Sequence, residues 1–244
     1  MLSKSEIKLI RSLSQKKFRD EEGLFVAEGE KLVEEAVKSD FEIVKIYRSD
    51  EIGEEAMSRI TLLNSPSPIL ALLKKPDTPK NSEINRLVAP KMLAIGLDGI
   101  RDPGNAGTII RIADWFGIDS IFASEDTVDI FNPKVVQSTM GAIFRIKFIY
   151  CDLQNIARTF VSQKMPIYGT FLEGEVIYDT ELLSYGLIIM GSESNGISKE
   201  IKPLVTQKLF IPPTSNGKPT SESLNVAAAT AIVCSEFRRQ GRKS

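Results

Sequence analysis

The chain has 244 residues, of which 42% are hydrophobic and 26% are charged, and its formal net charge at pH 7 is −1. This length and composition are those of a globular protein with one large or two modest domains, and the near-zero charge argues against binding nucleic acid by bulk electrostatics alone. Because the chain contains no histidine, every nucleophile that histidine would activate is excluded, together with the commonest metal ligand.

The N-terminal residues predict a small α/β unit. Apolar periodicity indicates a basic amphipathic helix at residues 3–18, a strand at 24–27, a helix at 31–37, and strands at 43–47 and 60–63. Residues 1–19 carry six Lys or Arg side chains against the single Glu6, and the tail after Glu236 is basic as well. Such basic ends either contact phosphates or are solvated helix faces.

We expect a cytoplasmic protein. The N-terminus lacks the apolar core of a signal peptide, and no apolar run approaches the roughly 20 residues that a membrane span needs. Cys151 and Cys234 lie far apart in the sequence, without metal-ligand spacing or the pattern of a disulfide framework. We therefore expect both cysteines in the core and no metal site.

The second half predicts a mostly parallel sheet with helices on both faces. Residues 75–91 are polar and contain three prolines, which is typical of a linker. The predicted linker is residues 77–90, and the predicted domains are residues 1–76 and 91–244. Beyond the linker, helical patterns separate continuous apolar runs, and we expect strands at 92–97, 118–123, 144–150, 167–171, 187–190 and 209–211. Asn132-Pro133, Asp152 and Ser198 predict helix starts, and Gly117 predicts a helix end.

Three polar loops follow predicted strands, each punctuated by glycine or proline. The first reads DGIRDPGNAGTIIR and contains Asn105 and Arg111, and the second reads GSESNGIS and contains Glu193. The third begins at Pro212 and leads through Ser223-Leu224-Asn225-Val226 into the last helix. Because the carboxyl ends of parallel strands meet at one edge of a sheet, we expect the three loops to converge there. Ser223 is also the residue type expected to cap the last helix. The chain contains neither the dinucleotide-binding glycine pattern nor a P-loop.

These loops resemble the three ordered motifs of the SpoU (TrmH-type) RNA 2′-O-methyltransferases of the SPOUT class. The resemblance lies in DPGNAGTIIR at 102–111, GSESNG at 191–196, and IPP at 211–213 with SLNVA at 223–227; KKFRDEEGLFVAEGEKLVEEAV at 16–37 resembles the substrate-binding module that precedes the catalytic domain in many members. This chain departs from the family pattern in two motifs. Family members usually have glycine after the glutamate of the second motif, where this chain has Ser194, and Ile-Pro-Met in the third, where this chain has Ile-Pro-Pro at 211–213. The additional residues Ser215–Thr220 are expected to form a mobile lid.

The resemblance implies a fold, a reaction and a site. The implied fold is an α/β sheet with a deep C-terminal trefoil knot, assembled as a homodimer, and residues 1–76 would bind the RNA substrate. The implied cofactor is S-adenosyl-L-methionine, and the acceptor is a ribose 2′-hydroxyl in RNA, with rRNA favoured over tRNA. The resemblance assigns catalytic positions to Arg111, Asn105, Glu193, Ser223 and Asn225, and cofactor-binding positions to Gly191, Ile211 and Leu224.

Two alternatives to an RNA methyltransferase remain open at the level of the sequence. An RNA-binding protein of the same fold could lack catalysis and use its basic N-terminal helix as a clamp. An unrelated α/β enzyme acting on a small molecule would show no dependence on RNA.

Overall fold

The computed structural model describes residues 2–79, 81–214 and 221–241. The described residues form two compact units. Unit 1 contains the residues up to Asp77 together with Ala106–Arg111 and Val128–Arg145, and unit 2 contains the rest. Each unit has its own sheet.

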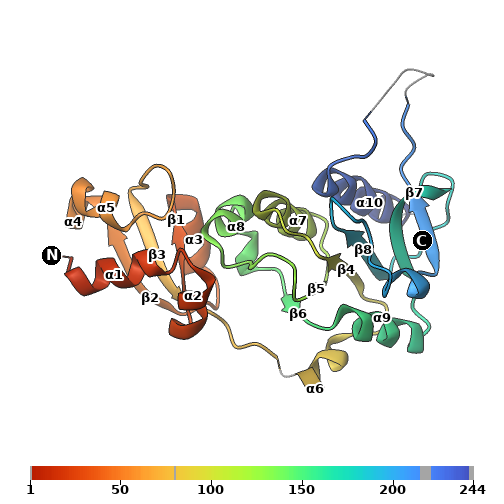
Figure 1. Cartoon of the computed structure of the whole chain (residues 1–244), viewed down its shortest axis with the longest axis horizontal. Helices are drawn as coiled ribbons and strands as arrows, with labels where there is room; N and C mark the ends of the chain where they lie inside the picture. Colours follow the sequence, from red (N-terminus) through yellow and green to blue (C-terminus); the bar gives the residue numbers. More distant parts are fainter. Residues whose placement is uncertain (1, 80, 215–220, 242–244) are drawn as a thin grey trace. The chain divides into compact units, whose positions relative to one another are not determined.

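Unit 1 is built on a three-stranded antiparallel sheet with the strand order β1-β3-β2 (Figure 1). Its strands are β1 (Leu24–Glu28), β2 (Ile43–Arg48) and β3 (Ile69–Lys74), and its helices are α1 (Lys4–Ser12), α2 (Lys16–Glu22), α3 (Glu30–Val37), α4 (Ser49–Ile52), α5 (Glu54–Ile60), α8 (Pro133–Thr139) and the 3₁₀ turn η2 (Ala142–Phe144). The predicted α/β character of this segment is confirmed.

Two predictions in unit 1 are wrong in detail. The helix expected at residues 3–18 is two helices, α1 and α2, and the second ends at Gly23, whose φ of 64° is the left-handed conformation that glycine adopts without strain. The strand expected at 60–63 does not form, because α5 continues to Ile60 and buries Met57 and Ile60 on one face. The third strand is instead the apolar run of β3.

A buried ion pair joins the N-terminal helices to the segment that contains α8. Arg19 is 2% exposed, and its Nε and Nη2 donate to Oδ2 of Asp129 at 2.9 and 2.6 Å, while Nη1 donates to the Leu13 carbonyl at 2.6 Å. The rings of Phe25 and Phe131 lie against each other with centroids 4.7 Å apart. These contacts make residues 128–145 part of the fold of unit 1.

Unit 2 contains a six-stranded sheet in which every pairing is parallel, as predicted. The order is β6-β5-β4-β8-β7-β9. The strands are β4 (Leu93–Asp98), β5 (Ser120–Ala123), β6 (Phe148–Tyr150), β7 (Ile167–Val176), β8 (Gly186–Gly191) and β9 (Gln207–Phe210), with helices α6 (Asn81–Ile84), α9 (Leu153–Ser162) and α10 (Val226–Gly241) and the 3₁₀ turns η1 (Asn85–Leu87) and η3 (Lys202–Leu204). Helix α7 (Pro103–Trp115) contributes residues to both units.

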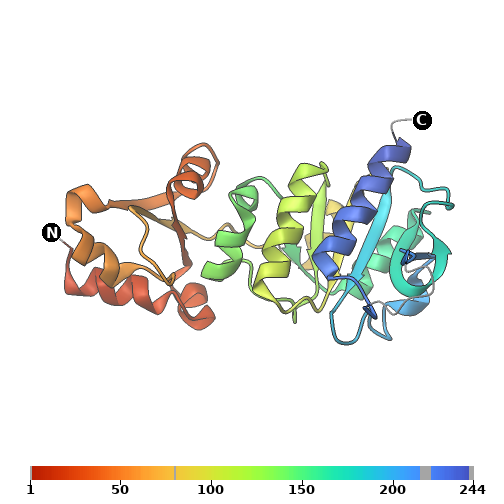
Figure 2. The same cartoon turned by 90° about the horizontal axis from the view of Figure 1, so that it is seen from above.

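Helices cover both faces of the parallel sheet. Helix α9 packs on one face against β4, β5, β7 and β8, and α10 packs on the opposite face against β8 (Figure 2). Arg238 of α10 donates from Nε to the Phe116 carbonyl at 2.7 Å, at the end of α7. No helix in the described ranges is long and apolar enough to cross a membrane.

Most of the predicted helix boundaries in the second half are confirmed. Asn132 and Asp152 are the N-caps of α8 and α9, and Gly117 has the left-handed φ of 59° just after α7. Ser198 does not start an α-helix, because the residues after it form turns that lead into η3. The cysteines are buried and unpaired, as expected, and burial raises the pKa of each thiol to about 12.

Replacing Arg19 by alanine leaves the buried Asp129 carboxylate without its cation, so we expect Arg19→Ala to lower the free energy of unfolding by about 3–5 kcal/mol. Urea denaturation of the full chain, followed by circular dichroism, measures the loss. Lys17→Ala is the matched control, because Lys17 pairs with Glu21 at 3.8 Å with both side chains exposed, and its loss should stay below about 0.5 kcal/mol. Equal effects of the two substitutions would contradict the structural role of the buried pair.

Glu28 gives unit 1 a predicted dependence of stability on pH. This carboxyl is 4% exposed and accepts from Thr61 Oγ1 and the Leu62 amide, but burial outweighs these bonds and raises its pKa above the usual 4.5. The folded state therefore holds the proton more tightly than the unfolded state, and the free energy of unfolding falls as the pH rises from about 4.5 through the raised pKa. Urea titrations at several pH values should show this fall for wild type and a smaller one for Glu28→Gln; parallel curves would contradict it.

Candidate active site

The loops after β4 and β8 begin side by side at the carboxyl edge of the parallel sheet. Asp98, the last residue of β4, pairs in register with Gly191, the last residue of β8. The loop after β4 then leads into α7, whose N-cap is Asp102; its Oδ1 accepts from the Asn105 amide at 2.7 Å. The Asp-Pro pair at 102–103 supplies the cap and a residue already fixed in helical φ, so the first turn of α7 holds Asn105 at this edge.

A chain of side-chain hydrogen bonds connects the three predicted loops. Asn105 Nδ2 donates to Oε1 of Glu193 at 2.5 Å, and Asn225 Nδ2 donates to Oδ1 of Asn105 at 2.9 Å. Because a carboxylate only accepts, the first bond fixes which end of the Asn105 amide is nitrogen, and each later bond follows from it. The predicted convergence of the loops is therefore observed for Asn105, Glu193 and Asn225.

The loop that carries Glu193 is a tight turn against the end of β8. Ser192 and Gly196 exchange two backbone hydrogen bonds of 3.1 and 2.9 Å, and Ser192 Oγ accepts from the Asn195 amide at 3.2 Å. A Cβ at Gly191 would lie 2.2 Å from the carbonyl carbon of Gly196, so the turn packs this closely only because residue 191 is glycine.

Asn225, and not Ser223, caps α10. Asn225 Oδ1 accepts from the amides of Ala227 and Ala228 at 2.9 and 3.3 Å, and the helix begins at Val226. The expectation that Ser223 is the cap is wrong, since both residues are good caps and the helix starts two residues later than the pattern indicated. Ser223 is exposed and makes no hydrogen bond with any other described residue. Its catalytic assignment stays a prediction.

The residues predicted to bind a cofactor lie at the same edge of unit 2. Gly191 ends β8 and is buried, Ile211 follows β9 and is half-buried, and Leu224 precedes α10 with 49% of its surface exposed. An exposed leucine and a half-buried isoleucine offer apolar area of the kind that a nucleobase covers. The predicted lid at Ser215–Thr220 lies outside the described residues.

Arg111 lies on α7, six residues after Asn105, and its side chain is exposed. Within the described part of the chain, the side chain of Arg111 makes no hydrogen bond or ion pair. Both ends of the Asn105 amide are occupied by Glu193 and Asn225. Asn105 therefore orders these two side chains and makes no bond to the Arg111 side chain.

Sequence reasoning missed the residues that hold the loops in place. Asp102 is recognisable afterwards as an N-cap before proline, which is a strong local pattern. Asp98 could have been noticed as a carboxylate at the end of an otherwise apolar strand. Its partner, the backbone amide of Ser198, is 100 residues away and no local pattern predicts it.

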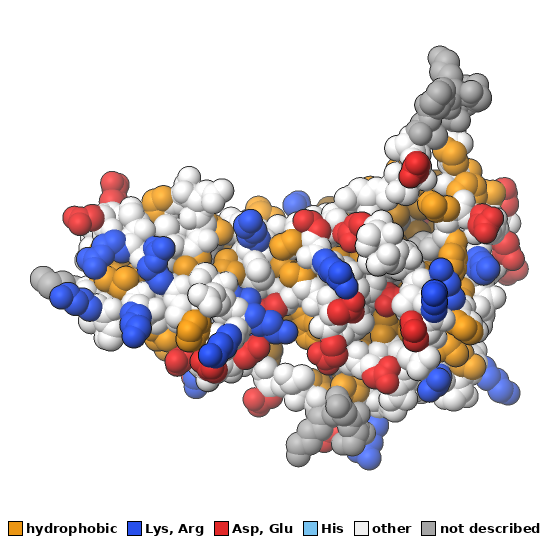
Figure 3. All heavy atoms as spheres, in the orientation of Figure 1, with side chains coloured by type: hydrophobic (Ala, Val, Ile, Leu, Met, Phe, Trp, Pro, Cys, Tyr) orange, Lys and Arg blue, Asp and Glu red, His pale blue; other side chains and the backbone are white. Residues whose placement is uncertain are grey.

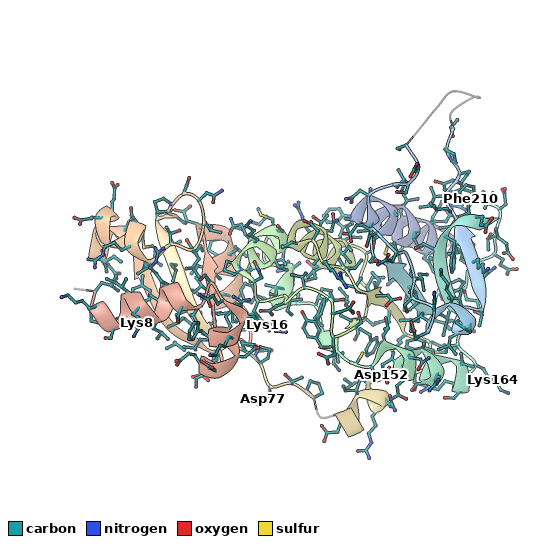
Figure 4. The ribbon with its side chains drawn as sticks, in the orientation of Figure 1. Lys8, Lys16, Asp77, Asp152, Lys164 and Phe210 are labelled. Carbon is teal, nitrogen blue, oxygen red and sulfur yellow. The ribbon has the colours of Figure 1, made fainter. Side chains whose placement is uncertain are left out.

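Basic side chains gather over α1 and α2 in unit 1 (Figure 3). Five of the six predicted basic residues, Lys4, Lys8, Arg11, Lys16 and Lys17, are exposed. Figure 4 labels two of them, Lys8 on α1 and Lys16 at the start of α2. The sixth is Arg19, which is buried in its ion pair and takes no part in the basic surface.

Comparisons with known proteins point to one family. Residues 92–235 match the model of the SpoU rRNA Methylase family, and residues 4–79 match that of the MRM3-like substrate binding domain. The 23S rRNA (guanosine(2553)-2'-O)-methyltransferase RlmP of Bacillus subtilis is 31% identical over 250 residues, covering 96% of each chain.

Solved structures agree with these matches. A protein of the TrmH family from Porphyromonas gingivalis is 35% identical with a TM-score of 0.85, covering 98% of this chain and 99% of the other. An AdoMet-bound rRNA methyltransferase from Sinorhizobium meliloti is 30% identical with a TM-score of 0.83, covering 98% of this chain and 97% of the other.

The hydrogen-bond chain predicts unequal effects of removing its two asparagines. Asn105→Ala removes exposed side-chain bonds and should lower the free energy of unfolding by about 1 kcal/mol. Asn225→Ala also removes the cap of α10, so its loss should be larger by about 1 kcal/mol. Urea denaturation measures both. Asn155→Ala, which breaks an exposed amide pair with Asn85 at 3.3 Å, is the matched control and should cost less than about 0.5 kcal/mol. A smaller loss for Asn225→Ala than for Asn105→Ala would contradict the capping role.

Proposed function

Since this chain belongs to the SpoU rRNA Methylase family, we propose that it transfers a methyl group from S-adenosylmethionine to a ribose 2′-hydroxyl of rRNA. The observation that carries the proposal is the hydrogen-bond chain from Asn225 through Asn105 to Glu193, which links the three loops that carry the motifs. Glu193 is 88 residues and Asn225 is 120 residues away from Asn105 in the sequence, so only the fold brings these side chains together.

The reaction suits a chain without histidine. The bound cofactor supplies a methyl group on a sulfonium, which is already activated for transfer. What the protein must add is alignment of the acceptor oxygen, a route by which the hydroxyl proton leaves to solvent, and stabilisation of the charge that develops on the oxygen. Glu193, Asn105, Ser223 and Asn225 are proposed to form the polar wall that orients the ribose.

Arg111 is proposed to stabilise a phosphate or the developing 2′-oxyanion. Its guanidinium is permanently charged and cannot accept a proton, so it is not the general base in the literal sense. Its exposed side chain is free to bind RNA, and its planar array of donors matches two oxygens of a phosphate.

Gly191, Ile211 and Leu224 are proposed to hold the cofactor. The half-buried Ile211 and the exposed Leu224 offer apolar surface for adenine, and the polar backbone of the turn after Gly191 offers donors and acceptors for the rest of the molecule. The solved relative from Sinorhizobium meliloti is AdoMet-bound, which supports the same cofactor for this chain.

Residues 1–76 are proposed to bind the RNA substrate, with residues 77–90 as the linker to the catalytic domain at 91–244. The exposed basic side chains of α1 and α2 support this role, because phosphate contacts of Lys and Arg supply sequence-independent affinity. The Bacillus subtilis relative methylates a guanosine of 23S rRNA, which favours rRNA over tRNA as the substrate.

A homodimer with a knotted C-terminal region, acting in the cytoplasm, completes the proposal. The order β4-β8-β7-β9 supports the knot, because the chain returns to the middle of the sheet after forming β7. Trp115 on α7 is 83% exposed, and a large apolar side chain on the surface is suited to a subunit contact. Light scattering of wild type and Trp115→Glu tests the dimer.

The second candidate is an RNA-binding protein of the same fold without catalysis. The basic surface of α1 and α2 favours this candidate, because RNA binding needs no catalytic residues. The complete polar set at the three loops favours the enzyme, because RNA binding alone gives no reason to join Asn105, Glu193 and Asn225. Calorimetry with S-adenosylmethionine separates the two candidates, since absence of binding at millimolar concentration would favour the binding protein.

The decisive measurement is methyl transfer to unmodified 23S rRNA, with the product mapped by 2′-O-methyl sequencing. We expect one methylated ribose, and the nucleotide equivalent to guanosine 2553 of the relative is the first position to inspect. Arg111→Lys keeps the charge but loses the planar donors, so we expect the single-turnover rate to fall at least about tenfold, equivalent to about 1.4 kcal/mol.

Arg101→Lys is the control for that substitution. Arg101 is 71% exposed, lies in the loop before α7, and pairs only at 3.5 Å with Asp126, so its replacement should leave the rate unchanged. A wild-type rate for Arg111→Lys would refute the role of the planar donors. Transfer to none of the cellular rRNA species would refute the proposed function.

A further inference from the structure

Asp98 makes a short hydrogen bond that links two of the loops of the site. It is the last residue of β4 and is 9% exposed, and its Oδ2 accepts from the backbone amide of Ser198 at 2.6 Å. A carboxylate that accepts a backbone N–H forms a charge-assisted bond, stronger than one between neutral groups. The bond holds the far end of the turn that follows β8.

That turn has its other end fixed as well. Gly191 belongs to β8, the backbone bonds between Ser192 and Gly196 close the turn, and Ile197 is 2% exposed in the core of unit 2. With its internal geometry fixed, the turn can change orientation only by moving where it joins the body of unit 2. Asp98 binds the residue directly after Ile197, at that junction.

The geometry points to Asp98 as a positioning residue for methyl transfer, which sets the orientation of the 192–198 turn and thereby the alignment of Glu193 with Asn105. The inference rests on the proposed function, because Glu193 and Asn105 belong to the same site. The 2.5 Å bond between them tolerates little displacement, so a shift of the turn reaches the site directly.

The same strand provides a matched control. Asp119 Oδ2 accepts from the amide of Leu93 at 2.7 Å, at the opposite end of β4. This bond has the same chemistry and nearly the same length, but it lies at the amino edge of the sheet, away from the loops. Its loss should therefore affect stability without affecting the site.

The experiment compares Asp98→Ala, Asp98→Asn, Asp98→Glu and Asp119→Ala in the full-length chain. Single-turnover methyl transfer is measured at saturating rRNA and S-adenosylmethionine, and hydrogen–deuterium exchange is followed in the peptide that contains residues 191–201. We expect Asp98→Ala to lower the rate by about tenfold to a hundredfold and to speed exchange in this peptide. Asp98→Asn keeps an oxygen that accepts the amide and should recover most of the rate. Asp119→Ala should change neither quantity.

A double-mutant cycle with Glu193→Ala isolates the positioning role. If Asp98 acts through Glu193, the double variant should be about as slow as Glu193→Ala alone. Rate losses that multiply, or a loss of the same size in Asp119→Ala, would overturn the inference. If Asp98→Ala does not fold, Asp98→Glu carries the test, because its extra methylene displaces the turn while keeping the charged acceptor, and a wild-type rate would overturn the inference.

Failure of the inference is distinct from failure of the proposed function. If the wild-type chain methylates rRNA and the Asp98 variants do so at the same rate, only the positioning role is refuted. A wild-type chain without methyl transfer refutes the function. In that case the exchange rates still decide whether Asp98 holds the turn, and unchanged exchange in Asp98→Ala would overturn the inference on its own.

Discussion

Because all six strands of unit 2 run parallel, β4, β8 and β9 end at one edge of the sheet, and the polar residues of the site depend on this constraint. Asn105, Glu193 and Asn225 are separated by long stretches of sequence, yet each lies in a loop or helix start that follows one of these strands. The apolar runs that form the strands thus determine where the polar side chains meet. The hydrogen bonds between the loops then determine their orientation.

Those hydrogen bonds have a single direction. They run from the amides at the start of α10, through Asn225 and Asn105, to the carboxylate of Glu193. Each amide side chain accepts at its oxygen and donates from its nitrogen, so reversing one asparagine would place two donors or two acceptors face to face. Asn225 and Asn105 therefore fix the position of the Glu193 carboxylate relative to the start of α10. Neither asparagine side chain has a titratable proton, so this link involves no change in their protonation.

The sequence predicted the parts of the molecule that depend on local patterns. Continuous apolar runs predicted the parallel strands of unit 2, except that the strand expected at 144–150 begins only at Phe148, because Phe144 belongs to η2. Asn132, Asp152 and Gly117 predicted helix ends, because capping and glycine conformation are local properties. The strand expected at residues 60–63 failed for a physical reason: Ile60 is buried with Met57 at the end of α5, and the Thr61 hydroxyl and the Leu62 amide donate to the Glu28 carboxylate. Periodicity over so few residues does not separate helix from strand.

Long-range polar contacts could not be predicted from the sequence, for a different reason. Arg19 resembled its basic neighbours on α1 and α2, but the fold pairs it with Asp129, 110 residues away, and removes it from the surface. Asp98 likewise binds a backbone amide 100 residues away. A buried charge stays in a fold only if its partner is present, and that partner comes from whichever segment the packing brings near. The partners of buried charged residues are therefore what the structure shows and the sequence does not predict.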